Sequence, residues 1–484
     1  MALAFLCGAC MQFSFSPYDI WWLALLLPAL VLWLAQRAYP FSHGYAFGVG
    51  WFGVGSWWLI ETFYLYGGLP YWVGVLIVAF IGLIMCLFPA LWFALACRLA
   101  RRSLHILWLF PVSVVLLEWL RGHLFTGLPW TALGNILLDT PAIGWASVVG
   151  VYGLAALPAL CIAALAIFPA YPRHAAAALL LTLALFFFAP APFLANGKTY
   201  TAALIQGNVP QDQKWDAAFL AQTLDHYIQL SSAVAKHADV IVWPESAVPF
   251  FPSRMPDWDQ WLQGKMMNLA TVVLYGGDRL LALGGEDAQS GLYAFVAGKR
   301  TFSGKQHLVP FGEYVPSWLP FIRTIIPAIA NFKPANGDGV LYAEGIGYGT
   351  LICYESIFPE QARDRINHGA EVLIVASNDA WYGHSPAVWQ HTQAARMRAV
   401  ETGRYLLRVG NTGITAVIAP DARIMDQLPW WQSASLTAPF QTSTAITPYV
   451  RWGDMPVLLL ACLLLILAVV FRWTSTNNMT QSRP

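Results

Sequence analysis

Charged residues are scarce in this chain of 484 residues. Only 11% are Asp, Glu, Lys or Arg, whereas an ordinary soluble domain carries about 25%. Hydrophobic residues make up 57%, so we expect much of the chain to lie out of contact with water. The formal net charge of +1 gives no electrostatic reason to expect nucleic acid as a partner. The composition therefore indicates a membrane protein and argues against one that binds DNA or RNA.

The scarcity of charge is uneven along the chain. Residues 1–193 and 455–471 contain almost no Lys, Asp or Glu, whereas residues 194–454 resemble an ordinary globular domain in composition. Apolar runs of about 20 residues can cross a bilayer, and such runs lie at 1–16, 20–36, 43–60, 71–97, 104–120, 142–170, 174–193 and 455–471. The sequence thus predicts a membrane domain of seven spans (1–193), a water-exposed domain (194–454), a final transmembrane helix (455–472) and a short tail (473–484).

The arginines predict how these spans are oriented, because Lys and Arg accumulate in cytoplasmic loops. They lie in alternate loops and in the tail, at Arg37, Arg98, Arg101, Arg102, Arg173, Arg472 and Arg483. The loops on the opposite side contain only Arg121. With both termini in the cytoplasm, an odd number of spans places residues 194–454 outside. We therefore expect the large domain to be exported.

Cysteine is also scarce in the predicted exported domain, where disulfides would be expected. Six of the seven cysteines fall in predicted spans, and residues 194–454 keep only Cys353. Exported cysteines normally pair, and this one has no partner in its own domain. It is either a reactive thiol or a buried inert one.

Within the exported domain, short β-branched runs alternate with helical patterns. The predicted strands are 199–205, 239–243, 271–275, 292–296, 346–353, 371–376, 405–409 and 414–418, and the predicted helices are 217–236, 358–368 and 386–404. This alternation is typical of an α/β domain whose sheet is covered by helices.

Two segments of this domain are unusually apolar. The first, 249–262, contains Phe250, Phe251, Trp258 and Trp261. The second, 316–332, contains Trp318, Phe321 and Ile322. Each is either a buried loop and core helix or an arm that enters the membrane interface, where Trp is favoured. Because both ends of the domain lead into membrane spans, we favour a membrane-facing arm for the second segment and leave both interpretations open for the first.

Three reactive side chains stand at the ends of predicted strands, where α/β proteins assemble their sites. Glu245 follows Val242-Trp-Pro, Lys305 follows Gly304, and Cys353 ends the apolar run that begins at Gly349. Each alone has an ordinary explanation, as a helix cap, a solvated charge or a buried thiol. His307 is expected to be structural, because no second ligand at metal-site spacing accompanies it.

Taken together, these three segments resemble the Glu, Lys and Cys motifs of the nitrilase (carbon-nitrogen hydrolase) superfamily, whose fold is an αββα sandwich. The order of seven spans, exported domain and last span resembles the bacterial apolipoprotein N-acyltransferases. So do the strings His307-Leu-Val-Pro-Phe-Gly-Glu-Tyr-Val-Pro316, Ser377-Asn-Asp-Ala-Trp-Tyr-Gly383 and Gln393-Ala-Ala-Arg-Met-Arg-Ala399. Ala419-Pro-Asp-Ala422 departs from the family's Asp-Pro-x-Gly and concerns a local turn. The resemblance implies a multi-pass protein of the bacterial inner membrane with cytoplasmic termini and a periplasmic catalytic domain.

The resemblance also implies roles for the three residues. Glu245 would be the general base, Cys353 the nucleophile and Lys305 the stabiliser of the tetrahedral oxyanion, helped by the backbone N–H of Tyr354. A thiol is mostly protonated at neutral pH, so it needs a neighbouring base or cation to react.

Four further positions match the family pattern. Glu313 resembles a second glutamate that positions Lys305 and the substrate. Trp215, Tyr354 and Glu355 match positions that the resemblance implies are needed, although core aromatics and a helix-start carboxylate remain open interpretations.

The implied reaction is ping-pong. Cys353 attacks an ester of a phospholipid, with phosphatidylethanolamine the expected donor, and forms a thioester. The N-terminal amine of a diacylglyceryl-cysteine apolipoprotein then takes the acyl group. No metal and no cofactor is expected.

Two alternatives from other classes stay open. A membrane-tethered amidase would use the same three residues with water as the acceptor. A transporter or channel with an exported accessory domain would carry charged residues inside its spans, where Glu118 is an exception to an otherwise uncharged set.

Overall fold

A computed structural model describes residues 1–269, 271–282, 284–317, 319–320, 323 and 330–481. It divides the chain into two compact units, residues 1–191 with 451–484, and residues 192–450. Trp318, Phe321 and Ile322, on which the predicted membrane-facing arm depends, lie outside the described residues.

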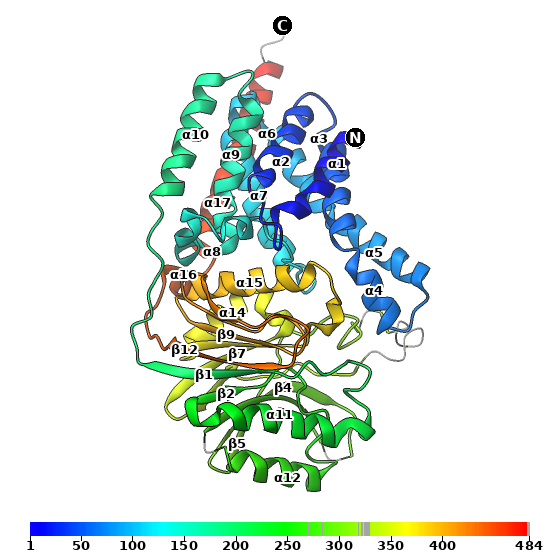
Figure 1. Ribbon diagram of the computed structural model, residues 1–484. Helices are drawn as coiled ribbons and strands as arrows, with labels where there is room; N and C mark the ends of the chain where they lie inside the picture. Colours follow the sequence, from blue (N-terminus) through cyan, green and yellow to red (C-terminus); the bar gives the residue numbers. More distant parts are fainter. Residues whose placement is uncertain (270, 283, 318, 321–322, 324–329, 482–484) are drawn as a thin grey trace. The chain divides into compact units, whose positions relative to one another are not determined.

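The first unit is helical (Figure 1). Its α-helices are α1 Ala2–Cys10, α2 Leu23–Ala35, α3 Pro40–Gly48, α4 Trp58–Leu65, α5 Tyr71–Met85, α6 Leu87–Leu99, α7 Ile106–His123, α8 Ala146–Leu154, α9 Ala156–Ile167, α10 Pro172–Phe187 and α17 Met455–Gln481. The short helix α16, Pro448–Trp452, precedes α17.

Several stretches of this unit have the length and apolarity that a membrane requires. Among the described residues, Tyr71–Leu99 and Ser103–His123 are long enough to cross, and Pro141–Leu154 with Ala156–Ile167 forms a pair bent by 63°. Shorter apolar helices are Ala2–Ser14, Leu23–Ala35, Pro172–Phe187 and Met455–Val470. The predicted span 43–60 is divided between α3, a π-helical turn at Val49–Gly53 and the start of α4. The total of eight spans stays a prediction.

The charged residue noted inside a predicted span has a structural partner. Glu118 and Arg121 form a fully buried ion pair at 3.0 Å near the end of α7. Arg121 also donates to the carbonyl oxygens of Leu128 and Trp130, and Glu118 accepts the backbone N–H of Leu133. The pair therefore holds the chain that follows α7, which gives these charges a role other than lining a transport path.

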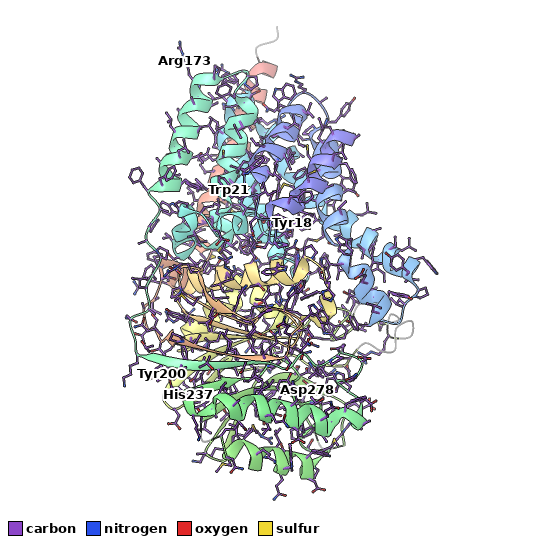
Figure 2. All side chains as sticks on the ribbon, viewed as in Figure 1. Tyr18, Trp21, Arg173, Tyr200, His237 and Asp278 are labelled. Carbon is purple, nitrogen blue, oxygen red and sulfur yellow. The ribbon has the colours of Figure 1, made fainter. Side chains whose placement is uncertain are left out.

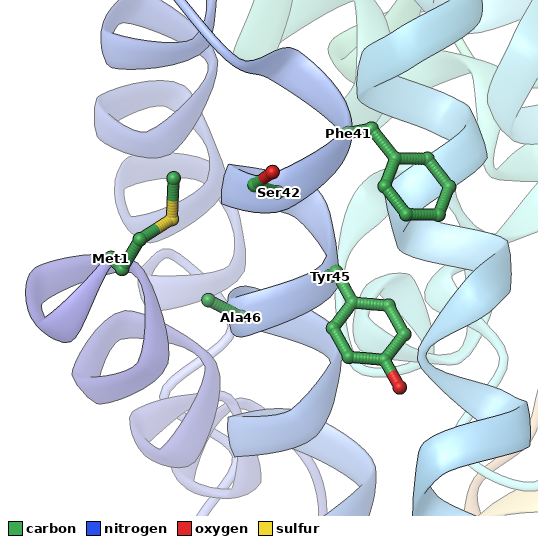
Figure 3. Close-up of a pocket in the computed structure, with 5 residues that line it drawn as sticks. All are labelled: Met1, Phe41, Ser42, Tyr45 and Ala46. Atoms are coloured by element: carbon green, nitrogen blue, oxygen red, sulfur yellow. The ribbon is translucent and has the colours of Figure 1, made fainter.

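A hollow of the helical unit is lined by Met1, Phe41, Ser42, Tyr45 and Ala46 (Figure 3). This lining contains no carboxylate, thiol or basic side chain, so it offers none of the reactive groups that the sequence singled out.

The second unit contains two six-stranded sheets with strand orders β12-β1-β2-β3-β4-β5 and β11-β10-β9-β8-β7-β6. The first sheet comprises β1 Thr199–Gln206, β2 Val240–Val242, β3 Val272–Leu280, β4 Ala288–Val296, β5 Lys299–Gly304 and β12 Ala434–Gln441. The second comprises β6 Val340–Ala343, β7 Ile346–Ile352, β8 Val372–Ser377, β9 Leu406–Gly410, β10 Ala416–Ile418 and β11 Ile424–Gln427. Every predicted strand is confirmed within a few residues, and β5, β6, β11 and β12 were not predicted.

Among the described residues, four helices cover the outer faces of the two sheets. Helices α11 (Leu220–Val234) and α12 (Pro256–Met267) lie on the first sheet, and α14 (Pro359–Asn367) and α15 (Ala387–Thr402) lie on the second (Figure 1). Alternate side chains of the strands meet between the sheets, among them Leu204, Val242, Ile374 and Val409. The unit is therefore an αββα sandwich, as expected.

The apolar segment 249–262 contributes to a second core, between the first sheet and its covering helices. Phe250 is buried, and Trp258 and Trp261 of α12 pack against the layer between helix and sheet. Burial accounts for its composition, so the core interpretation holds for this segment.

The departure from the family pattern at residues 419–422 is local. This turn joins β10 to β11, and Ala422 has a φ of 70°. Glycine adopts this left-handed conformation without the steric cost that a Cβ introduces. The departure therefore affects one turn only.

Strand direction brings the three reactive residues to one end of the sandwich. In the first sheet β2 runs parallel to β3, and β5 runs in the same direction as β3 because both are antiparallel to β4. Glu245 follows β2 and Lys305 follows β5, while Cys353 follows β7 of the second sheet. Gly276 of β3 permits this close packing, because a Cβ there would overlap the carbonyl oxygen of Pro244 and lie 2.7 Å from Cα of Glu245.

We expect Gly276→Ala to lower the apparent melting temperature of the purified protein, because overpacking of this kind typically costs about 1–3 kcal/mol. Gly264→Ala is the matched control. Gly264 lies on the exposed face of α12 with no atom near its missing Cβ, so alanine there should be neutral or stabilise by up to about 1 kcal/mol. Equal melting temperatures for the two variants would contradict the close contact.

Candidate active site

Cys353 occupies a sharp turn at the end of β7. It is the first residue after the strand, opens a 3₁₀ turn over Cys353–Ile357, and has a φ of 50°. Its carbonyl oxygen accepts a hydrogen bond from the Ser356 hydroxyl at 2.9 Å and lies 3.0 Å from Nε2 of His391. A non-glycine residue in this conformation is uncommon, and such residues cluster at functional sites. The turn fixes the place of the thiol, which is largely buried.

Glu245 bridges the two sheets. Its Oε1 lies 3.4 Å from Nζ of Lys305, and its Oε2 accepts the backbone N–H of Asn378 at 2.9 Å. Lys305 follows β5 of the first sheet, whereas Asn378 follows β8 of the second. Both carboxylate oxygens are therefore held, and the side chain is only 9% exposed.

Lys305 lies between two carboxylates. Its Nζ is 2.6 Å from Oε1 of Glu313 as well as 3.4 Å from Glu245, and the other oxygen of Glu313 accepts the backbone N–H of Val309 at 2.8 Å. Burial alone would lower the pKa of Lys305, but the negative charges of Glu313 and Glu245 outweigh it and raise that pKa above its ordinary value. The side chain is therefore an ammonium at every physiological pH.

Burial raises the pKa of the Cys353 thiol to about 12. That pKa includes a smaller upward contribution from the negative charge of Glu245 and opposing contributions from the Lys305 ammonium and a hydrogen bond with Ser377. The thiol is thus protonated at neutral pH and can act as a nucleophile only if a base takes its proton during attack. Glu245 and Lys305 both lie close enough to act on its charge, so the structure brings the three predicted residues together.

Glu355 ties the lysine segment to the cysteine turn. One carboxylate oxygen accepts the backbone N–H groups of Gln306 and His307 at 2.7 and 3.0 Å, and the other accepts that of Ile352 at 2.8 Å. The side chain is fully buried and also pairs with Arg365 at 3.5 Å. Glu355 therefore sets the distance between the residues after Lys305 and the strand that carries Cys353.

The two predicted aromatic residues have different surroundings. The Tyr354 ring is buried and makes edge contacts with the rings of Phe358 and His307, at centroid distances of 4.9 and 5.7 Å. His307 also stacks on Phe358 at 3.9 Å, in agreement with the structural role expected for it. Trp215 is 50% exposed, whereas the neighbouring Lys214 is buried and contacts Glu245.

Lys214 is one of several polar residues near the site that the sequence analysis missed. It is 2% exposed, and its Nζ donates to the carbonyl oxygen of Glu245 at 3.0 Å. Asp278 of β3, also 2% exposed, lies in the same buried region. Their positions depend on β1, β2 and β3 lying side by side, which no local pattern predicts.

A second buried network supports the cysteine turn from behind. Asp379 accepts hydrogen bonds from Ser377 and Arg408, the latter at 2.6 Å, and lies 3.1 Å from Nδ1 of His391. Burial alone would raise the pKa of Asp379, but the positive charge of Arg408 and the contact with His391 hold it below its ordinary value. The string Ser377-Asn-Asp contributed to the family resemblance without a role, and this network supplies one.

Two family profiles match parts of this chain. Residues 7–165 match the family profile described as apolipoprotein N-acyltransferase N-terminal domain, and residues 304–447 match carbon-nitrogen hydrolase. The second match contains Lys305 and Cys353. A solved amidase of the nitrilase superfamily from Nesterenkonia is 16% identical, covers 55% of this chain and 97% of its own, and has a TM-score of 0.41.

Curated relatives match the whole chain. The apolipoprotein N-acyltransferase of Shewanella oneidensis is 34% identical over 98% of this chain and 96% of its own length. That of Methylococcus capsulatus is 34% identical over 95% and 93%. With the fold and the two matched regions, this similarity along its full length shows that the chain belongs to the apolipoprotein N-acyltransferase family.

Proposed function

We propose that this protein transfers a fatty acyl group from a membrane phospholipid to the N-terminal amine of the diacylglyceryl-cysteine of apolipoproteins. The single observation that supports this chemistry most is the buried Lys305, held between Glu245 and Glu313 beside the Cys353 thiol. The printed names of the full-length relatives support the choice of substrates.

In the first half-reaction, Glu245 takes the proton from Cys353 while Sγ attacks the ester carbonyl of the phospholipid. Lys305 and the backbone N–H of Tyr354 stabilise the oxyanion of the tetrahedral intermediate. The carbon–oxygen bond then breaks, and Glu245 returns the proton to the leaving lysophospholipid. A thioester remains on Cys353.

In the second half-reaction, the acceptor's amine attacks the thioester carbonyl and gives a proton to Glu245. The oxyanion forms in the same place, so the same donors stabilise it. The carbon–sulfur bond breaks, the thiol regains its proton, and an amide is released. Every step uses residues of this chain alone.

The helical unit supplies the lipid environment that both substrates need. Leu76 and Phe80 of α5, Leu180 of α10 and Leu459 of α17 are exposed apolar side chains, which suits contact with acyl chains better than contact with water. We propose the predicted topology of seven spans, a periplasmic domain and a final span in the bacterial inner membrane, with phosphatidylethanolamine as the donor.

A membrane-tethered amidase would use the same three residues with water as the acceptor. Incubating the purified protein with phospholipid separates the two functions by mass. An amidase would not retain an acyl group from lipid, whereas the proposed enzyme would gain one that hydroxylamine removes.

We expect Cys353→Ser to fold and to lose both the lipid adduct and acyl transfer, because the hydroxyl is a far weaker nucleophile than a thiol in this site. Intact mass spectrometry of the protein incubated with lipid measures the adduct. Cys462→Ser is the control, since Cys462 is an exposed cysteine of α17, and it should retain both. Transfer by the Cys353→Ser protein would show that another residue is the nucleophile.

We expect Lys305→Met to slow formation of the acyl-enzyme by about a hundredfold or more, the usual effect of losing an oxyanion donor. It should also slow alkylation of Cys353 by iodoacetamide at a fixed neutral pH. The Lys305 charge lowers the pKa of the thiol, so its removal raises that pKa and reduces the thiolate fraction. Lys265→Met, a change of an exposed lysine on α12, should leave both rates unchanged. Unchanged rates in Lys305→Met would contradict the assigned role.

A further inference from the structure

A second lysine lies behind the proposed general base. Lys214 belongs to the turn that follows β1, and its buried Nζ donates to the carbonyl oxygen of Glu245 at 3.0 Å. A buried carbonyl oxygen needs a hydrogen-bond donor. The backbone on either side of Glu245 is also conformationally restricted. Pro244 precedes Glu245, and Ser246 follows it with a φ of 50°. The Lys214 contact therefore fixes the main chain from which the Glu245 side chain extends.

Asp278, which is labelled in Figure 2, supplies negative charge near Lys214. On β3, Leu274 points into the core between the sheets, so Gly276 and Asp278, at alternate positions, share that face. The position of Gly276 is the one that abuts Glu245. Oδ1 of Asp278 has no hydrogen-bond partner among the described residues, which is unusual for a buried carboxylate.

The charges facing these two residues come from several elements. Lys214 faces Glu245, Asp278 and Cys353. Asp278 faces Lys214, Glu245 and Glu313, and its carboxylate is hydrogen-bonded to Ser290. Burial lowers the pKa of Lys214 to about 8, although the nearby negative charges oppose that shift, and burial raises the pKa of Asp278 to about 7. The charge of Lys214 therefore changes just above neutral pH.

We infer that Lys214 is a positioning residue that holds Glu245 in its working place, with Asp278 as its counter-charge. This inference rests on the proposed role of Glu245. As an ammonium, Lys214 makes a charge-assisted hydrogen bond to the Glu245 carbonyl, which is stronger than a neutral one. Once it loses its proton, the bond weakens and the site loses one positive charge beside Glu245. The ordinary alternative is a lysine that only satisfies a buried carbonyl and contributes to stability.

Two substitutions of Lys214 distinguish these possibilities. Methionine keeps the length and apolar stem but removes the donor and the charge, whereas glutamine keeps a donor without the charge. The measurement is the single-turnover rate of Cys353 acylation by phosphatidylethanolamine in the full-length protein, between about pH 6 and about pH 10, a range that spans the ordinary pKa of a thiol.

For wild-type protein we expect the rate to fall above about pH 8, where Lys214 loses its proton. Lys214→Met should acylate about tenfold more slowly at neutral pH, a loss of transition-state stabilisation. Lys214→Gln, which keeps a donor but not the charge, should recover only part of that loss, and neither variant should show the fall near pH 8. A Lys214→Met protein with the wild-type rate and the same fall would overturn the inference, even if Cys353→Ser confirms the nucleophile.

Asp278→Asn tests the pair without altering Lys214. Because the negative charge of Asp278 raises the pKa of Lys214, its removal should move the alkaline fall to lower pH. If both Lys214 variants fail to fold, this shift decides the question, and a fall that stays at the wild-type pH overturns the inference. If wild-type protein forms no thioester at all, the proposed function fails instead.

Discussion

The ion pairs at Lys305 are the interaction on which the site depends. A buried ammonium is costly unless it is paired and hydrogen-bonded. Here two carboxylates satisfy it, Glu245 from 60 residues away in the chain and Glu313 from 8 residues away. The same contacts fix both glutamates, and Glu245 is in turn held by the backbone of the second sheet. Because each charge compensates another, the three cannot be moved independently. The same contacts therefore fix both the packing of the two sheets against each other and the positions of the charged side chains in the site.

Much of the architecture could be predicted from the sequence because its signals are local. The central strands are continuous apolar runs, and Glu245 and Cys353 come at or just after the ends of predicted strands, whereas Lys305 follows β5, which was not predicted. The four strands that were missed, β5, β6, β11 and β12, lie at the edges of the two sheets. Edge strands are partly exposed, as in Lys299–Gly304 and Ile424–Gln427. Their hydrophobic pattern is too weak to distinguish them from loops.

The site residues that were missed have a different cause. Lys214 lies in a polar turn and Asp278 late in a strand, and both read as solvated surface charges in the sequence. Their burial follows from β1, β2 and β3 being neighbours, a property of the tertiary fold. Trp215 shows the converse, since a core aromatic was one interpretation of it, yet it is half exposed. Local composition identifies reactive groups more reliably than it identifies the residues that hold them.

The buried position of Cys353 also bears on how long an intermediate would persist. A thiol whose pKa is about 12 is a poor leaving group, since thiols of low pKa depart fastest. The burial that raises this pKa also keeps bulk water from the sulfur. An acylated enzyme of this kind would be durable in the absence of an amine. It could wait for its second substrate to diffuse through the bilayer, so that encounters with donor and acceptor need not coincide.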